Sequence, residues 1–199
     1  MSRQYCKHCA YPITTCVCGA IETLALPNRV IILQHKNESK HAKNTARLAK
    51  LVSPSIEIVD VSDSASLSIL SKSLLTSEVL VLYPNNTSIA IESYIQEHAK
   101  NAEKNDLLRK PITLILIDAN WRQAYGIWQQ QKWLKAFTHC HFDNLPSKQY
   151  VIRKSKKAHQ LSTIEALAHS LEIISGVSGQ AYLNVFSFMQ RHWTRHQKE

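Results

Sequence analysis

The order of apolar and polar residues along the chain predicts strands that alternate with helices. Short, nearly continuous apolar runs indicate buried strands, and we assign such strands to 29–34, 56–59, 79–82 and 112–117. Apolar residues three and four positions apart predict helices over about 42–52, 67–75, 88–100 and 180–196. Weaker patterns indicate strands near 139–142 and 150–152, and the polar stretch 101–110 is expected to form a surface loop.

Two further helices are predicted from local signals. Ser162 and Glu165 have the spacing of a capping box, and the residues after them place apolar side chains on one side of a helix. A helix after Asp118 would place Trp121, Ala124, Tyr125 and Trp128 on one face. Alternating strands and helices predict an α/β fold, with a mostly parallel sheet covered by helices on both faces.

Length and composition fit one substantial domain with a small appendage. The chain has 199 residues, of which 44% are hydrophobic, so it can bury its own core. It has only four glycines, which excludes both a dinucleotide-binding fingerprint and a glycine-rich phosphate loop. No leader segment or long apolar stretch is visible, so we expect a soluble, cytoplasmic protein that does not enter membranes.

The charge of the chain favours an anionic partner. The formal net charge is +9, and nucleic acid is the commonest anionic partner of a basic soluble protein. The basic residues gather in three groups that contain no acidic residue, although any one group can simply be a solvated face. These groups are Lys40, Lys43, Arg47 and Lys50; Arg153, Lys154, Lys156, Lys157 and His159; and Arg191, Arg195 and Lys198.

Four cysteines near the start of the chain predict a metal site. Cys6, Cys9, Cys16 and Cys18 have the pattern C-x2-C-x6-C-x-C, which suits a structural zinc ion held by four thiolates in a reducing compartment. His8 is a spare ligand, and disulfides or free thiols are the alternatives. So short a segment would fold only with its metal, so we expect a zinc knuckle over 1–26 and a catalytic domain over 27–199. Cys140 is expected to be a buried strand residue.

Polar residues follow several predicted strands, at the edge where α/β proteins bind ligands. The most informative is Asp118, a carboxylate directly after the most apolar run of the chain. Helix capping is the alternative role for Asp118, and packing in the core is the alternative role for Trp121.

These motifs, taken in order, resemble the DTW-domain family, which is related to the SPOUT group of RNA-modifying enzymes. The resemblance covers nearly the whole chain. One departure is Asn120, which stands where the family usually has threonine; both residues can cap a helix. After the cysteines, the motifs are Leu33-Gln34-His35 with Glu38, Asn44-Thr45-Ala46-Arg47, Leu82-Tyr83-Pro84, Ile117-Asp118-Ala119-Asn120-Trp121, Arg153-Lys154 and Leu161-Ser162-Thr163-Ile164-Glu165-Ala166.

The resemblance implies a SPOUT-like fold with a C-terminal trefoil knot and a tRNA-uridine aminocarboxypropyltransferase activity. Such an enzyme transfers the 3-amino-3-carboxypropyl group of S-adenosylmethionine to N3 of uridine and releases 5′-methylthioadenosine. Asp118 is the candidate base. The implied cofactor-binding residues are Leu82, Tyr83, Pro84, Asp118, Trp121, Ser162, Thr163 and Glu165, and the implied RNA-binding residues are Lys43, Arg47, Arg122, Arg153, Lys154, Lys156 and Lys157.

Two other functions fit the same features. A SPOUT-type RNA methyltransferase would use the same cofactor and the same class of RNA. A zinc-dependent RNA-binding module without catalysis would also show the cysteine pattern and the basic charge, but it leaves Asp118 and the Ser162 capping box without a role. We expect a monomer, because the aminocarboxypropyl branch need not dimerise as SPOUT methyltransferases usually do.

Overall fold

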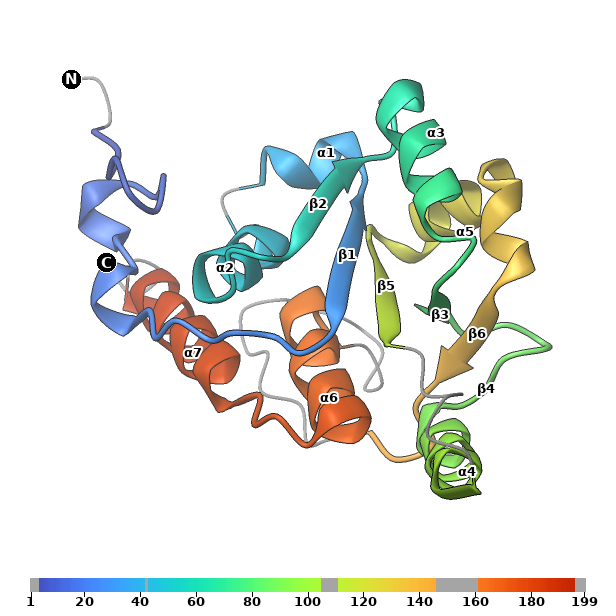
Figure 1. The fold of residues 1–199 in the computed structure, drawn as a ribbon. Coiled ribbons are helices and arrows are strands. Elements are labelled where there is room, and N and C mark those ends of the chain that lie inside the picture. Colours follow the sequence, from blue (N-terminus) through green and yellow to red (C-terminus); the bar gives the residue numbers. More distant parts are fainter. Residues whose placement is uncertain (1–3, 42, 105–110, 146–160, 196–199) are drawn as a thin grey trace.

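A computed structural model describes residues 4–41, 43–104, 111–145 and 161–195 of the chain. Its centre is a six-stranded sheet in which all paired strands are parallel, in the order β2-β1-β5-β3-β6-β4 (Figure 1). The predicted α/β class with a parallel sheet is thereby confirmed. The strands are β1 (Arg29–Gln34), β2 (Glu57–Asp60), β3 (Glu78–Leu82), β4 (Ile89–Ala90), β5 (Ile112–Asp118) and β6 (Thr138–His141).

Helices connect these strands, and most of them begin at a side chain that caps the free backbone N–H groups. Asn44, Asp63, Asn120 and Ser162 each accept a hydrogen bond from the first turn that follows. The helices are α1 (Lys36–Ser39), α2 (Thr45–Val52), α3 (Ser64–Ser73), α4 (Ile91–Lys104), α5 (Trp121–Gln130), α6 (Thr163–Ser175) and α7 (Gln180–Arg195), with the 3-10 helices η1 (Ile13–Thr15), η2 (Cys18–Ala20) and η4 (Lys132–Ala136).

The sheet is covered on both faces, and β1 shows the alternation. Val30 and Ile32 belong to a core formed with α2, α4, α6 and α7, whereas Ile31 and Leu33 belong to a second core formed with α3 and α5. Successive strand side chains point to opposite faces, so a strand that is apolar throughout must be buried on both sides. This arrangement explains the continuous apolar runs in the sequence.

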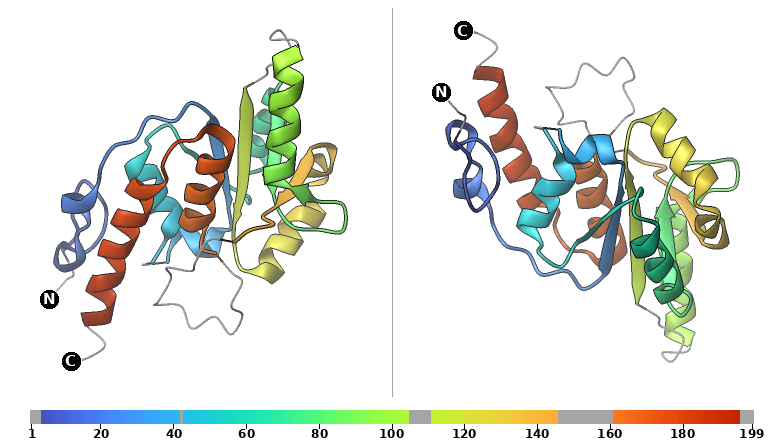
Figure 2. Two further views of the ribbon diagram at one scale, coloured as in Figure 1. Left: turned by 90° about the horizontal axis from the view of Figure 1, so that it is seen from below. Right: turned by 90° about the horizontal axis from the view of Figure 1, so that it is seen from above.

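The cysteine-rich segment lies beside α7, at the end of the molecule opposite α4 and α5 (Figures 1 and 2). Both η1 and η2 pack against α7. Cys9, Tyr11 and Val17 are buried in the same core cluster as α2, α6 and α7. The segment therefore shares the core of the chain, and the division at residue 26 stays a prediction.

Several predicted helix boundaries were wrong, among them that of α3, which begins at Ser64 and not at 67. The helix expected from residue 42 begins only at Thr45, because the side chain of Asn44 caps it, so Lys40 and Lys43 precede the helix. The stretch 101–110 was expected to be a loop, but α4 continues to Lys104. The helix expected from residue 88 is preceded by the short strand β4. The expected strand 150–152 lies outside the described residues.

The exposed face of α5 also differs from the predicted pattern. Ala124 and Ile127 are the residues that pack on the sheet, while Trp121 and Tyr125 are 51% and 55% exposed. Trp128 packs against the same core, so Trp121 and Tyr125 are the rings of this helix that are left on its outer side. The core role considered for Trp121 is therefore wrong.

Within the described part of the chain, no helix combines the length and the apolar character needed to cross a lipid bilayer.

Candidate active site and metal-binding knuckle

The carboxyl ends of β1 and β5 form the most polar point of the sheet. Gln34 and Asp118 are the last residues of the two strands and are paired in register. The chain leaves β1 toward α2 on one face and leaves β5 toward α5 on the other. Ligands of open α/β sheets bind where the connections diverge in this way. The candidate site therefore lies at this pair of strand ends.

Asp118 is buried, and the protein satisfies both of its carboxylate oxygens. Its side chain is only 7% exposed. Nε2 of Gln34 donates a hydrogen bond of 2.8 Å to Oδ2, and Oγ1 of Thr163 donates one of 2.5 Å to Oδ1. A buried carboxylate is costly without such partners. Each oxygen has a second lone pair, so the carboxylate can still accept a proton or a further hydrogen bond.

The first turn of α6 brings Thr163 to Asp118. Ser162 caps this helix, and Oε2 of Glu165 accepts hydrogen bonds from the backbone N–H and the hydroxyl of Ser162, at 2.8 and 2.7 Å. The predicted capping box is confirmed. The positive end of the helix dipole thus faces the Asp118 carboxylate, which favours negative charge there. Glu165 is buried and fixes the start of the helix.

Two further residues of the site belong to sequence motifs, but no site role was predicted for them. Gln34 and Asn44 link Asp118 to α2, since Nε2 of Gln34 also lies 3.4 Å from Oδ1 of Asn44. Both side chains are only 6% exposed. The available signal was a polar residue at the end of an otherwise buried strand, but its partner on the neighbouring strand depends on strand register.

The residues predicted after β3 lie on the other side of β5. Tyr83 is 7% exposed, and its ring stacks on Trp128 with 5.5 Å between centroids. Burial raises the pKa of the Tyr83 phenol. Leu82 is half-buried and Pro84 is exposed. These residues border β5 but stand one strand further from β1 than the Gln34–Asp118 pair.

An aromatic and histidine cluster supports that side of the site. Nε1 of Trp128 donates to Nε2 of His139 over 3.1 Å, which requires that ring nitrogen to be unprotonated. Burial lowers the pKa of His139, in agreement with a neutral ring. The cluster positions α5 against β3 and β6.

Asn120, the departure from the usual motif, keeps the role of a cap. Its Oδ1 accepts from the backbone N–H of Gln123 at 3.0 Å, and its own N–H donates to Oε1 of Gln123 at 3.1 Å. Asparagine therefore starts α5 directly after Asp118. Trp121 begins the helix with its side chain half exposed to solvent.

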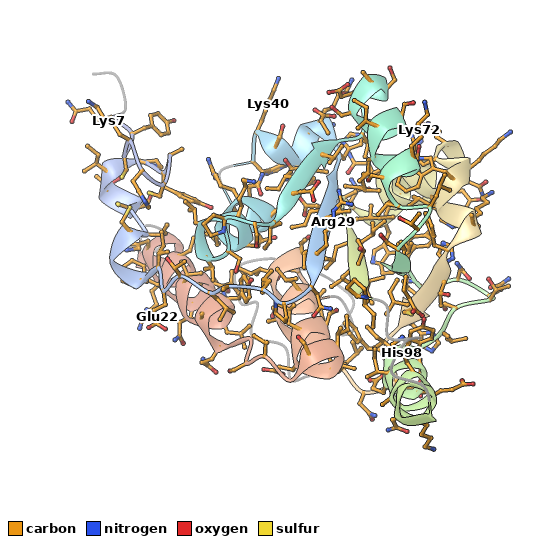
Figure 3. All side chains as sticks on the ribbon, viewed as in Figure 1. Lys7, Glu22, Arg29, Lys40, Lys72 and His98 are labelled. Carbon is orange, nitrogen blue, oxygen red and sulfur yellow. The ribbon has the colours of Figure 1, made fainter. Side chains whose placement is uncertain are left out.

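The residues predicted to bind RNA are only partly described. Arg122 is exposed on the first turn of α5. Arg47 packs its guanidinium 4.1 Å from the centroid of the Tyr11 ring, and burial lowers the pKa of the half-buried Lys43. Lys40, shown in Figure 3, extends away from the ribbon. Arg153, Lys154, Lys156 and Lys157 lie outside the described residues.

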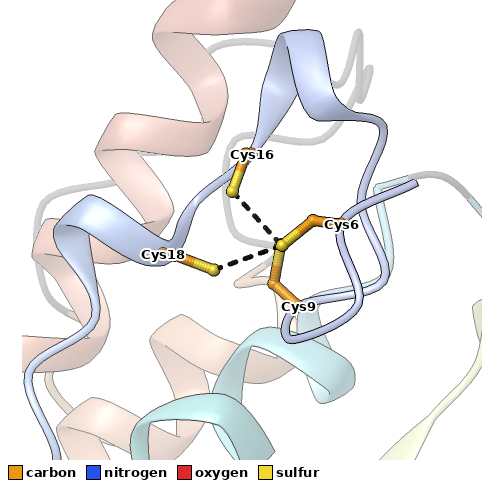
Figure 4. A group of neighbouring side chains, drawn as sticks. All are labelled: Cys6, Cys9, Cys16 and Cys18. Carbon is orange, nitrogen blue, oxygen red and sulfur yellow. Dashed lines mark hydrogen bonds between the residues drawn. The ribbon is translucent and has the colours of Figure 1, made fainter. Parts of the chain in front are cut away.

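The side chains of the four clustered cysteines come together within the N-terminal segment (Figure 4). The Sγ atoms of Cys6 and Cys18 are 3.6 Å apart, those of Cys9 and Cys16 are 3.7 Å apart, and all four lie within 4.8 Å of one another. In a tetrahedral site with zinc–sulfur bonds of 2.3 Å, the sulfur atoms would be about 3.8 Å apart. The cluster can therefore hold a metal such as zinc. All four thiols are free, so the disulfide alternative is not supported.

The electrostatics of the knuckle also suit a cation. Backbone N–H groups of Cys9 and His8 lower the pKa of Cys6 to about 6, whereas burial and the neighbouring thiols raise the pKa of Cys18. Four thiolates at this distance repel one another unless a positive charge lies between them. Nδ1 of His8 is 3.5 Å from the sulfur of Cys18, so His8 contacts a ligand and is not one of the four. Cys140 is buried in β6 as predicted, and burial raises its pKa to about 12.

The comparison with known proteins agrees with this arrangement. Over residues 3–194 the chain matches a model of the DTW domain, which includes both the knuckle and the Asp118 site. No solved structure matches.

Three curated relatives carry the name tRNA-uridine aminocarboxypropyltransferase 2. The relative from Drosophila melanogaster is 27% identical over 179 residues, which is 86% of this chain and 67% of the relative. Those from Mus musculus and Macaca fascicularis are each 26% identical over 86% of this chain and 57% of their own length. The chain thus spans little more than half the length of the two mammalian proteins. Because the domain match covers nearly all of it, the chain belongs to the DTW-domain family.

Proposed function

We propose that this chain is a tRNA-modifying transferase, and more precisely a tRNA-uridine aminocarboxypropyltransferase that uses S-adenosylmethionine. The observation that carries the proposal is Asp118, a buried carboxylate oriented by Gln34 and Thr163 at the divergence point of a DTW-domain sheet. The names of the three relatives support the same reaction.

The proposed donor supplies an electrophilic γ-carbon attached to a sulfonium. N3 of uridine forms a bond to that carbon, the carbon–sulfur bond breaks with its electrons on sulfur, and 5′-methylthioadenosine leaves. Asp118 accepts the proton of N3, which is too weakly acidic to attack without a base. Gln34 and Thr163 hold the carboxylate in place so that little reorganisation is needed.

The polar and aromatic residues around Asp118 fit a donor of this chemistry. The half-exposed ring of Trp121 offers a flat surface for an adenine ring, and Tyr83, whose ring stacks on Trp128, would border the donor. Ser162, Thr163 and Glu165, at the amino-terminal end of α6, would line the donor site beside Asp118. Leu82 and Pro84 complete the proposed set. We further infer that the chain contains the SPOUT-like knot. Residues 146–160, between β6 and α6, are outside the described part of the chain.

The other predicted properties remain part of the proposal. The metal is zinc with a structural role, because four protein thiolates leave no ligand position for water. Lys43, Arg47, Arg122 and the basic residues of 153–157 contact tRNA phosphates. The protein acts in the cytoplasm, as a monomer.

Mass spectrometry of nucleosides from unmodified tRNA, incubated with the protein and S-adenosylmethionine, tests the reaction. A uridine heavier by one aminocarboxypropyl group, with an equal amount of 5′-methylthioadenosine, is expected. A base heavier by one methyl group would instead assign the protein to the methyltransferases. No modification, together with no donor binding in calorimetry, would reduce it to an RNA-binding module.

A further inference from the structure

Tyr11, between the two pairs of cysteines, connects the knuckle to the candidate active site. The backbone N–H of Cys6 donates to the carbonyl of Tyr11 over 2.8 Å, which ties the residue to the metal-binding loop. The Tyr11 side chain is fully buried, and its hydroxyl donates a hydrogen bond of 3.0 Å to the carbonyl oxygen of Asn44. The phenol of Tyr11 therefore joins the knuckle to the N-cap of α2.

Asn44 can couple Tyr11 to Gln34 because hydrogen bonds hold both polar atoms of its side chain in place. Its Nδ2 donates to the carbonyl of Glu38 at 2.9 Å, and its Oδ1 accepts from the backbone N–H of Arg47 at 2.8 Å. The same Oδ1 faces Nε2 of Gln34 at 3.4 Å. A shift of Asn44 would change the orientation of the Gln34 amide, which has no freedom to turn while Asn44 and Asp118 both accept from it.

Arg47 provides a second contact between the same two elements. Its guanidinium lies over the Tyr11 ring, and Nη1 is 3.4 Å from the carbonyl oxygen of Ala10. The first turn of α2 is thus held on both sides by the loop that carries the thiols. Cys9 and Val17 are buried in the same core as Tyr11, and the other three cysteines pack against it. A metal held by the four thiols would therefore fix the loop that contacts α2.

We propose that Tyr11 is a positioning residue, through which the metal-loaded knuckle sets the orientation of Gln34 and hence of Asp118. The hydrogen-bonded series runs from the Tyr11 hydroxyl to Asn44, from Asn44 to Gln34 and from Gln34 to Asp118. Loss of the metal would release Tyr11 and loosen the network at the carboxyl ends of β1 and β5. The expected fall in the transfer rate rests on the proposed function, whereas the expected change in the orientation of the Gln34 amide does not.

The test compares Tyr11→Phe with Tyr182→Phe in the metal-loaded protein. Each variant deletes one buried phenol hydroxyl and keeps the ring. The hydroxyl of Tyr182 is bonded to Ser53, at the opposite end of α2, and has no contact with the network. A loss of stability alone would therefore affect both variants in a similar way.

The first readout is the side-chain amide signal of Gln34 in a nitrogen–proton NMR spectrum, assigned by its absence in Gln34→Leu. We expect this signal to shift in Tyr11→Phe and in the wild-type protein after chelation of the metal, and to stay in place in Tyr182→Phe. An unchanged signal in both Tyr11→Phe and the chelated protein would overturn the proposal. Equal shifts in the two Phe variants would do the same.

The second readout is steady-state transfer to tRNA. Tyr11→Phe should lower kcat about 5- to 10-fold, as expected for the loss of one orienting hydrogen bond, with KM for tRNA nearly unchanged. A rise in KM alone would contradict a positioning role. If the wild type transfers nothing but the Gln34 signal still moves as expected, the proposed function fails and the coupling from the knuckle to the network stands. If Tyr11→Phe does not fold, the chelated wild type decides the question by NMR.

Discussion

The thiol knuckle and the Asp118 network are both polar clusters, yet they are built in opposite ways. The four cysteines of the knuckle come from thirteen consecutive residues and need little surrounding structure to meet. Gln34, Asn44, Asp118 and Thr163 come from four separate elements and meet only because strand register and helix caps align them. The knuckle can hold a metal between its thiols, whereas the network depends on the alignment of the whole sheet.

The difference has a consequence for function. A local cluster can be lost, through its metal, without unfolding the sheet. A distributed network is lost only with the fold or with one of its own side chains. Because Tyr11 joins the two clusters, the state of the first can alter the second. Single substitutions can therefore affect one cluster without the other.

Replacing Asp118 should have the largest effect. Asp118→Asn keeps the size of the side chain but removes the proposed base, so transfer should fall about 10²- to 10⁴-fold. Binding of tRNA and the unfolding temperature should change little. Rates of 5′-methylthioadenosine release measure the effect, with the exposed Asp143→Asn as the control. Full activity in Asp118→Asn would eliminate Asp118 as the base.

Removing one thiol of the knuckle should come next. Cys16→Ser should abolish binding of about one zinc per chain. Loss of a structural metal lowers the free energy of unfolding by roughly 4 kcal/mol or more in many domains. For a chain of this size, that corresponds to a fall of about 10 °C or more in Tm. Atomic absorption and calorimetry check both values. Cys140→Ala, a buried cysteine outside the cluster, should keep the metal; equal metal content in both variants would refute the site.

Removing one hydrogen bond to Asp118 should have a smaller effect. Thr163→Val deletes the hydroxyl that donates to Oδ1 while keeping the shape of the side chain. A hydrogen bond to a charged group contributes about 1.5–3 kcal/mol, so kcat should fall at least about 10-fold. Thr163→Ser should restore most of the rate, since it returns the hydroxyl. If Thr163→Ser were as slow as Thr163→Val, the hydrogen bond from the hydroxyl to Asp118 would not be the cause of the lower rate.

The smallest effects are expected for Arg122 and Arg47, which are both proposed to bind RNA but should differ in their effect on stability. Arg122→Ala should weaken tRNA binding and reduce the slope of its salt dependence by about one unit, with no change in Tm, because Arg122 is exposed. Arg47→Ala should also lower Tm, because Arg47 packs on Tyr11. Binding titrations at several salt concentrations, with thermal unfolding, measure both. Identical behaviour of the two variants would contradict the assigned positions.

Much of the fold followed from local sequence patterns. The predicted strands at 29–34 and 112–117 agree with β1 and β5 within one residue, since continuous apolar runs leave few alternatives in an α/β protein. The Ser162–Glu165 capping box was also recognised, because its signal spans only four residues. Boundaries failed where a single polar side chain decided them, as Asn44 does at the start of α2.

Local sequence patterns were enough to predict the parallel α/β plan and the thiol cluster and to single out Asp118 as a candidate, because periodicity, ligand spacing and a carboxylate after a buried strand are local properties. Only the tertiary structure decided what surrounds Asp118. The register of β1 against β5 places Gln34 beside the carboxylate, and the start of α6 brings Thr163 to its other oxygen. Those contacts join residues as many as 84 positions apart, and no local pattern encodes which distant strand ends will be neighbours in the sheet.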